Sequence, residues 1–354
     1  MSKTEQKTTS PETSNAEASP KENTATHLRN LLQIQNSWGR WFFMGLTSVI
    51  LCTLGPLSIF APFPLLSVFL IYGRLKGHIL GLGILLLLVA FSAQLDRSHL
   101  IMGIFLMNFL FAALLAEIIL RQEHPITGLL KAGGGIVLIV AAIFTMIYLS
   151  SDFSLEKYLS TAISEKLTQF KTENAKLLEE SGEEAAVLKD LLDKPERLVA
   201  DVIPWLPSMA FATIFISLWI NLFMALQNIR AWRFFTPYKY ALKELVYFKV
   251  NEYLVWPLIA GLGLVLAGEH FVGKLGMAFG QNLLTGLSVF YFLQGFGVLL
   301  DFLTHVKIFG FMRSLFIVFT IYLEWRIVVI IGVFDLWFDF RKFLKKNDKE
   351  GDSL

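Results

Sequence analysis

Charged residues are scarce in this sequence. Asp, Glu, Lys and Arg make up only 17% of its 354 residues, 55% are hydrophobic, and the mean hydropathy is +0.57. Soluble globular domains carry roughly 25% charged residues, so this composition excludes an ordinary soluble chain. The net charge of +2 is also too small to indicate a nucleic-acid partner.

Metal-binding side chains are few and scattered. Cys52 is the only cysteine and lies within an apolar run, so one chain can form neither a disulfide nor a thiolate metal site. The six histidines include no pair at the i, i+3 or i, i+4 spacing that a local zinc site needs. No metal or cofactor is expected.

Catalytic motifs are missing as well. The sequence has no Walker A loop, H-E-x-x-H, G-x-S-x-G or Rossmann glycine pattern. The glycine cluster 133–135 lacks the Gly-Lys-Ser/Thr ending of a phosphate loop and is better explained by close helix packing. We therefore do not predict an enzyme.

Long apolar runs are abundant. A helix needs about 20 apolar residues to cross a bilayer, and six runs reach about that length or more without Asp, Glu, Lys or Arg. They are Trp41 to Gly73, Gly77 to Leu95, Ser98 to Ala116, Ala132 to Ser151, Val202 to Ile229 and Leu275 to Leu300. The sequence predicts an all-α, polytopic bundle of transmembrane helices in contact with the lipid bilayer.

The N-terminal part divides into a tail and membrane helices. Residues 1–27 are polar, lack aromatic residues and are expected to be disordered. Residues 28–41 fit either a short interfacial helix or an extension of the first span. N-terminal membrane helices are expected within 28–150, and no cleavable signal peptide is expected.

Proline and glycine divide the first apolar run. It is too long for one crossing, so the chain should fold back at Gly55-Pro56, and Pro62 and Pro64 should make the second span irregular or partly unwound. We place the spans at about 41–55, 57–73, 77–94, 99–120, 128–150, 203–229, 252–268 and 283–303.

The run 308–340 raises the same question, because Glu324 and Arg326 interrupt it. Lys and Arg favour the cytoplasmic side, and they cluster at residues 74–76, in the linker 230–250 and after residue 340. All three stretches can face the cytoplasm, together with the N-terminus, if 308–340 forms two short crossings or a re-entrant hairpin. Within a range of about eight to ten segments we favour ten, and nine stays open. The predicted location is the bacterial inner membrane.

Residues 151–202 form the one substantial insertion, and 152–201 carry 12 acidic and 7 basic residues, a net charge of minus five. Apolar residues at helical spacing predict an outer amphipathic helical hairpin, with one helix after residue 154 and another around 186–192. It either caps an outer vestibule or is a solvated spacer. C-terminal membrane helices follow in 203–342, and a basic polar tail in 343–354.

Several polar residues lie at membrane depth. Ionisable groups there are costly and tend to face protein or water, so Glu117, Asp301, Glu324 and Arg326 are candidates for function or for interfacial ion pairs. Neutral side chains such as Asn221 and Gln294 suit hydrogen bonds between helices.

The C-terminal line Gly332-Val333-Phe334-Asp335-Leu336-Trp337-Phe338-Asp339-Phe340-Arg341 is the most distinctive in the chain. Asp335 and Asp339 are one helical turn apart, and Trp337 suits the headgroup level. The two carboxylates form either a cation, proton or partner site, or a solvated helix end paired with Arg341.

That line, the pair Gln294-Gly295 and the segment 247–256 resemble the bacterial YybS-like family of multi-pass membrane proteins. The resemblance covers mainly residues 200–342, and Lys249-Val250-Asn251 departs from the family's usual pattern. The family is in turn distantly similar to the substrate-binding S components of energy-coupling-factor transporters, which rely on partner ATPases. The resemblance implies capture of an unknown small ligand, although S components usually have six spans.

Two functional hypotheses follow. The first is a transport-related protein with its site between Pro62-Pro64 and the late spans carrying Gln294 and Asp301, so that neutralising Asp301 abolishes ligand binding. The alternative is an interaction or scaffolding protein of envelope assembly or cell division that docks other membrane proteins.

Overall fold

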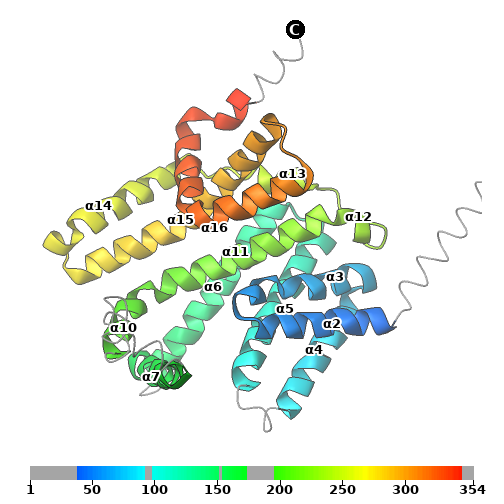
Figure 1. Cartoon of the computed structure of the whole chain (residues 1–354), viewed down its shortest axis with the longest axis horizontal. Coiled ribbons are helices and arrows are strands. Elements are labelled where there is room, and N and C mark those ends of the chain that lie inside the picture. The colour runs from blue at the N-terminus through cyan, green and yellow to red at the C-terminus, as the bar shows by residue number, and fades with distance from the viewer. Residues whose placement is uncertain (1–37, 92–97, 151–153, 174–194, 345–354) are drawn as a thin grey trace, which may run out of the picture.

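The computed structural model of the chain describes residues 38–91, 98–150, 154–173 and 195–344. The predicted disordered tail, residues 28–37 and the second insertion helix at 186–192 lie outside these ranges. All regular elements in the described residues are helices (Figure 1). The α-helices are α2 (Trp38–Thr53), α3 (Pro62–Tyr72), α4 (Arg74–Ala90), α5 (Ser98–Leu120), α6 (Pro125–Ser150), α7 (Leu155–Glu173), α10 (Pro195–Val202), α11 (Leu206–Gln227), α12 (Ile229–Trp232), α13 (Leu242–Val246), α14 (Val255–Phe271), α15 (Lys274–His305) and α16 (Gly310–Phe338). Three short 3-10 helices join them: η1 (Gly55–Phe60), η2 (Ile203–Trp205) and η3 (Glu252–Leu254).

Six described stretches are long and apolar enough to cross a membrane. They are Gly55–Tyr72, Leu100–Leu120, Pro125–Ile147, Val199–Gln227, Lys274–His305 and Gly310–Phe338, and a shorter apolar helix covers Glu252–Gly268. The predicted all-α polytopic bundle is confirmed.

The chain reverses between α2 and α3, as predicted from Gly55-Pro56. Gly55 has a φ of 58°, which glycine adopts without steric cost, and the chain then forms η1. The two helices on either side pack together, and the Ser48 hydroxyl on α2 donates to the carbonyl of Ala61 at 2.7 Å.

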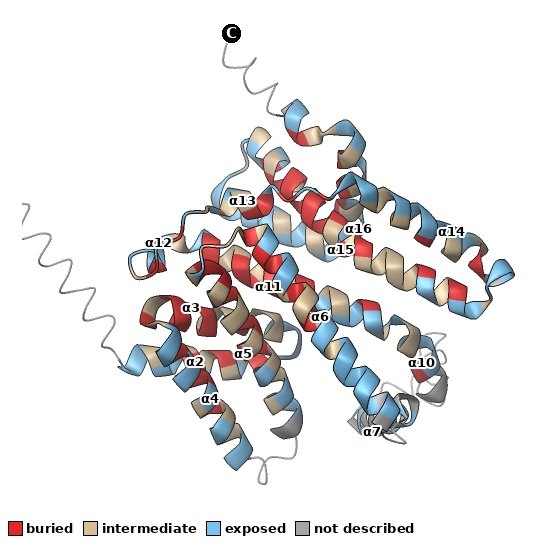
Figure 2. Ribbon diagram, turned by 180° about the vertical axis from the view of Figure 1, so that it is seen from behind, coloured by how far each residue is buried: buried red, intermediate tan, exposed pale blue. Residues whose placement is uncertain are grey.

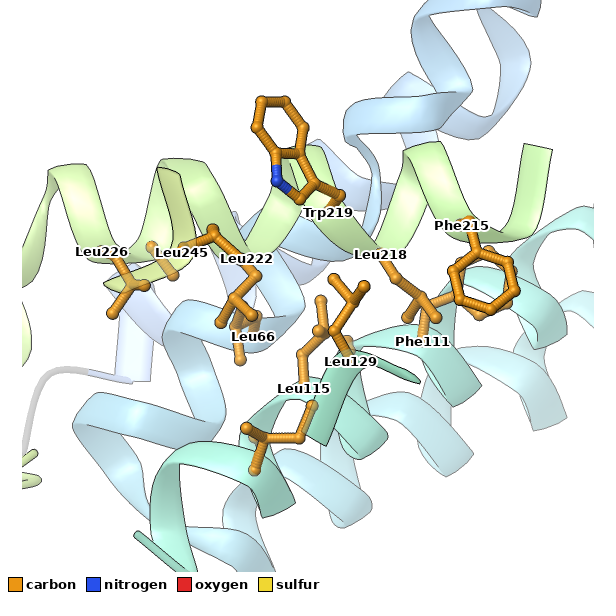
Figure 3. Packing of buried hydrophobic residues seen from close by; sticks show 14 of the residues in the cluster. Leu66, Phe111, Leu115, Leu129, Phe215, Leu218, Trp219, Leu222, Leu226 and Leu245 are labelled. Carbon is orange, nitrogen blue, oxygen red and sulfur yellow. The ribbon is translucent and has the colours of Figure 1, made fainter. Parts of the chain in front are cut away.

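Helix α11 lies at the centre of the molecule. It packs against α3, α5 and α6 on one side and against α15 on the other. Figure 2 shows buried residues concentrated on α3, α11 and α15. Figure 3 shows Leu218 and Leu222 of α11 facing Leu66, Leu115 and Leu129. Because lipid tails are as apolar as these side chains, close packing holds this core together.

Helices α14 and α15 form an antiparallel pair that glycines hold close together. A side chain at Gly268 would lie 3.3 Å from backbone atoms of Gly276 and Met277, and one at Gly280 would lie 3.0 Å from the carbonyl of Gly261. Small residues on both helices therefore allow close backbone contact.

Two short crossings or a re-entrant hairpin were predicted between 308 and 340, and this run forms two helical halves that meet at Glu324. α16 comprises both halves, and Glu324 at the kink between them has non-helical dihedral angles, with a φ of −139° and a ψ of 42°. Arg313 near its start donates to the carbonyl of Leu300, and Arg341 just after its end donates to that of Gln294. A straight helix of this length would be about 43 Å long, whereas the two acceptors are less than two turns apart on α15. The polar residues mark a sharp bend that brings both ends of α16 back to α15.

The connections at one end of the bundle are tied together by hydrogen bonds. Thr236 in the linker donates to the carbonyl of Leu70 at the end of α3, and Tyr238 donates to that of Glu123, both at 2.7 Å. Because Arg341 also contacts this linker, residues 70–76, 121–124, 236–250 and 341 lie on one side. Helices α7 and α10 lie together at the other ends of α6 and α11 (Figure 1).

Candidate functional site

The stretch 55–64, here called the proline-broken segment, changes at Ala61 from the 3-10 helix η1 to α3. Its backbone needs hydrogen-bond partners from other helices. Pro62 has no N–H with which to donate to the carbonyl of Ile59, so this acceptor loses its local partner. Asn221 on α11 donates to it through Nδ2 at 2.7 Å, and the Ser217 hydroxyl lies 3.4 Å away. The predicted role of Asn221 in bonding between helices is confirmed.

A cavity of about 1050 Å³ lies beside this segment. Its lining comes from η1, α5, α6, α7 and α11. The described lining residues are Pro56, Ser58, Ile59, Leu100, Gly103, Ile104, Met107, Asn108, Phe111, Val140, Tyr158, Glu165, Ala210, Thr213, Ile214 and Ser217. The volume matches the upper range of small-molecule sites, and the mostly apolar wall with a few polar groups is typical of them.

Three features shape the wall of this cavity. Asn108 is buried and bonds to the Ile104 carbonyl of its own helix at 2.9 Å, with Cys52 Sγ at 3.7 Å. Gly103 has open space where a side chain would project, so the wall is hollow there. On the far side, Tyr158 and Glu165 reach the cavity from α7 of the insertion.

Pro62 and Pro64 are not in the lining. They begin α3, where proline fits because the first turn of a helix needs no N–H donors, and they place η1 against α11. Sequence reasoning identified the break but missed Asn108, Thr213, Ser217 and Glu165. These are single polar residues within helical patterns, and nothing local to them indicates a shared cavity.

A second polar cluster joins α15 to the end of α16. Gln294 Nε2 donates to Asp335 Oδ2 at 2.9 Å, and Gln294 Oε1 accepts from the N–H of Val250 at 2.8 Å. The other oxygen of Asp335 accepts from the N–H of Phe340 at 2.9 Å. Both side chains are almost completely buried, and their polar groups are paired as buried groups must be.

Arg341 completes this cluster. It donates to the carbonyls of Val246 at 3.3 Å, Phe248 at 3.2 Å and Gln294 at 2.6 Å, and its Nε lies 3.9 Å from Asp335 Oδ2. Burial lowers the pKa of Arg341, and the carboxylates of Asp335, Asp301 and Asp339 oppose that shift. The cluster thus fixes the linker, α15 and the C-terminal end of α16 to one another.

Glycines let the two helices of this cluster meet backbone to backbone. A side chain at Gly295 would collide with the carbonyl of Val328, and one at Gly332 with that of Tyr291. A side chain at Gly297 would collide with the carbonyl of Val246 and the guanidinium of Arg341. The structure therefore brings the two motifs of the C-terminal half, Gln294-Gly295 and Gly332 to Arg341, into one contact.

Asp301 and Asp339 both lie close enough to Arg341 to act on its pKa. Asp339 has a φ of 45° and ends α16, and its N–H donates to the carbonyl of the buried Asp335 one turn earlier. Trp337 is 60% exposed. Asp301 is half-buried on α15, and α11 lies between that helix and the proline-broken segment.

No group of three or more His, Cys, Asp or Glu residues that could hold a metal ion occurs among the described residues. Both polar regions are therefore built from hydroxyls, amides, backbone groups and a few charges. Their chemistry is hydrogen bonding and charge recognition.

Comparison with known proteins gives one match. No curated protein and no solved structure matches the chain. A family model matches residues 42–336, which include the cavity-lining helices, Gln294 and Asp335. The chain belongs to the family described as "Predicted membrane protein (DUF2232)".

Proposed function

We propose that this membrane protein captures a small organic molecule in the cavity beneath α7. The observation that carries the proposal is a cavity of about 1050 Å³ beside a broken helix, with α7 of the insertion at one wall. Broken helices often border transport sites, because irregular backbone at membrane depth is tolerated where it lines a cavity or is buried in protein. This placement moves the expected ligand site away from Asp301.

Charge supports an orientation with the cavity on the outer side. The basic linker lies on the same side of the molecule as Arg74, Lys76 and Arg341. Its basic residues are Arg230, Arg233, Lys239, Lys243 and Lys249. The insertion at the opposite ends of α6 and α11 is acidic. By the positive-inside rule the basic side faces the cytoplasm. The beginning of α2 and Arg341 after α16 lie on this side.

Labelling in intact cells tests this orientation. In a Cys52→Ser background, we expect a membrane-impermeant maleimide to react with Thr172→Cys on α7 and to leave Lys345→Cys unmodified until the cells are opened. Modification of Lys345→Cys from outside would disprove the inward tail.

The capture proposal includes a partner. Absence of a recognisable ATP-binding loop is compatible with a protein that relies on a separate ATPase, as the S components of energy-coupling-factor transporters do. Likeness to S components and to the YybS-like family forms part of this proposal, and fold analogy alone does not fix a function.

Filling the cavity should remove the captured molecule. We expect Gly103→Phe to place a ring in the space that the ligand needs. Gly134→Phe is the matched control, because Gly134 on α6 also has open space around it and does not line the cavity.

Full-length protein is purified in mild detergent from its own membrane, and small molecules released on denaturation are identified by mass spectrometry. The proposal expects one compound in wild type and Gly134→Phe, reduced at least tenfold in Gly103→Phe, with similar melting temperatures in all three. Equal recovery from wild type and Gly103→Phe would contradict it. Protein partners without any such compound would favour the scaffolding alternative, in which the basic side docks other membrane proteins.

A further inference from the structure

The cavity has a one-sided charge distribution. Glu165 on α7 is the only ionisable carboxylate among the described residues that line it, and none of those residues is Lys, Arg or His. The insertion that supplies Glu165 has a net charge of minus five. The one ionised side chain in the described part of the lining therefore favours a cationic over an anionic ligand.

The rest of the wall suits a molecule with an apolar body. Met107, Phe111 and Ile214 provide apolar surface, and hydroxyls of Ser58, Thr213 and Ser217 provide a few hydrogen-bonding positions. Aromatic rings also attract cations through their faces. Tyr158 lies on the same helix as Glu165, so an aromatic ring and a carboxylate occur together on the α7 side of the cavity.

A bare metal ion does not fit this arrangement. The cavity is far larger than one ion, and one carboxylate without a second acidic or histidine ligand in the described lining cannot complete a coordination shell. The size and apolar walls require a ligand of many atoms.

We propose that the cavity takes an organic cation with an apolar body, its charged end near Glu165 and Tyr158 and its apolar part between α5 and α11. This inference rests on the proposed capture function and names the class of its ligand. Glu165 attracts the charged end of the ligand, and Gly103, which has no side chain, leaves space for the ligand's apolar part.

Two thiol reagents of similar size and opposite charge test the inference. The trimethylammonium and sulfonate ethyl methanethiosulfonates are both membrane-impermeant, and each reports the access of its own charge to a chosen cysteine. Thr213→Cys places the thiol in the cavity wall, and Thr172→Cys places it on α7 outside the lining, both in full-length Cys52→Ser protein in intact cells. At each cysteine, the modification rate with the cationic reagent is divided by the rate with the anionic reagent. The ratio at Thr213→Cys is then divided by the ratio at Thr172→Cys, so that the difference in intrinsic reactivity between the two reagents cancels.

We expect this normalised ratio to be about fivefold in favour of the cation, the effect of one partly screened charge at close range. Adding Glu165→Gln should return it to about one; because Glu165 is exposed, this change should leave the melting temperature unaltered. A normalised ratio of one or below in the protein that retains Glu165 would overturn the proposal of a cationic ligand. It would not overturn the proposal that the cavity captures a small molecule. If neither reagent reaches Thr213→Cys until the protein is unfolded, the capture function itself fails.

Discussion

Gly332→Ala is expected to lower the melting temperature of the purified protein strongly. The new methyl group would collide with the backbone carbonyl of Tyr291. A backbone carbonyl within a helix cannot relieve a collision by changing rotamer, as a flexible side chain can. The helices must separate, which costs about 1–3 kcal/mol or more and loosens the contact between α15 and α16. Gly295→Ala should behave alike, because it meets the carbonyl of Val328.

The matched control is Gly263→Ala on α14, where nothing lies within 4 Å of the added methyl group. Alanine is a better helix former than glycine, so this variant should melt at the wild-type temperature or slightly above. Thermal melting followed by size-exclusion chromatography measures both. A Gly332→Ala protein as stable as Gly263→Ala would show that the two helices do not meet at these residues.

Arg341→Ala is expected to give the second large loss. It removes three hydrogen bonds to carbonyls and leaves the buried carboxylate of Asp335 without its nearby cation. Breaking a buried pair in this way costs about 3–5 kcal/mol. Lys342→Ala changes the exposed neighbouring residue and should have little effect.

A double variant separates the charge from the hydrogen bonds. In Asp335→Leu with Arg341→Leu no unpaired buried charge remains, so the double variant should be more stable than the sum of the two single losses implies. Free energies of unfolding from denaturant titration supply the comparison. Strict additivity would mean that Asp335 and Arg341 do not interact, contrary to the 3.9 Å separation.

The sequence predicted features that depend on local chemistry. Apolar length predicted the helices, Gly55-Pro56 predicted the reversal, and the polar residues 324–326 marked the place where α16 bends. Each follows from residues close together in the chain. The predicted alternatives there, two short crossings or a re-entrant hairpin, both turn the chain back, and the kink at Glu324 does so without a loop.

Local sequence patterns did not predict how the helices pack against one another. On α16 the buried residues Val328, Gly332 and Asp335 follow a helical stripe, yet their exposed neighbours Ile327 and Ile330 are just as apolar. Lipid-facing and protein-facing positions of a membrane helix can have the same composition. For this reason the sequence did not reveal that α11 separates the proline-broken segment from Gln294 and Asp301, or that Glu165 reaches the cavity.

Capture of a small molecule in the cavity beneath α7 is tested most directly by an electron cryo-microscopy map. The map is made from full-length protein extracted from its own membrane without added ligand. If the cavity holds a captured molecule, the wild-type map should show compact non-protein density between Ile59, Met107 and Thr213, with α7 against the cavity. The map of Gly103→Phe should show no such density. A cavity closed by its own side chains, or one occupied equally in both proteins, would contradict it.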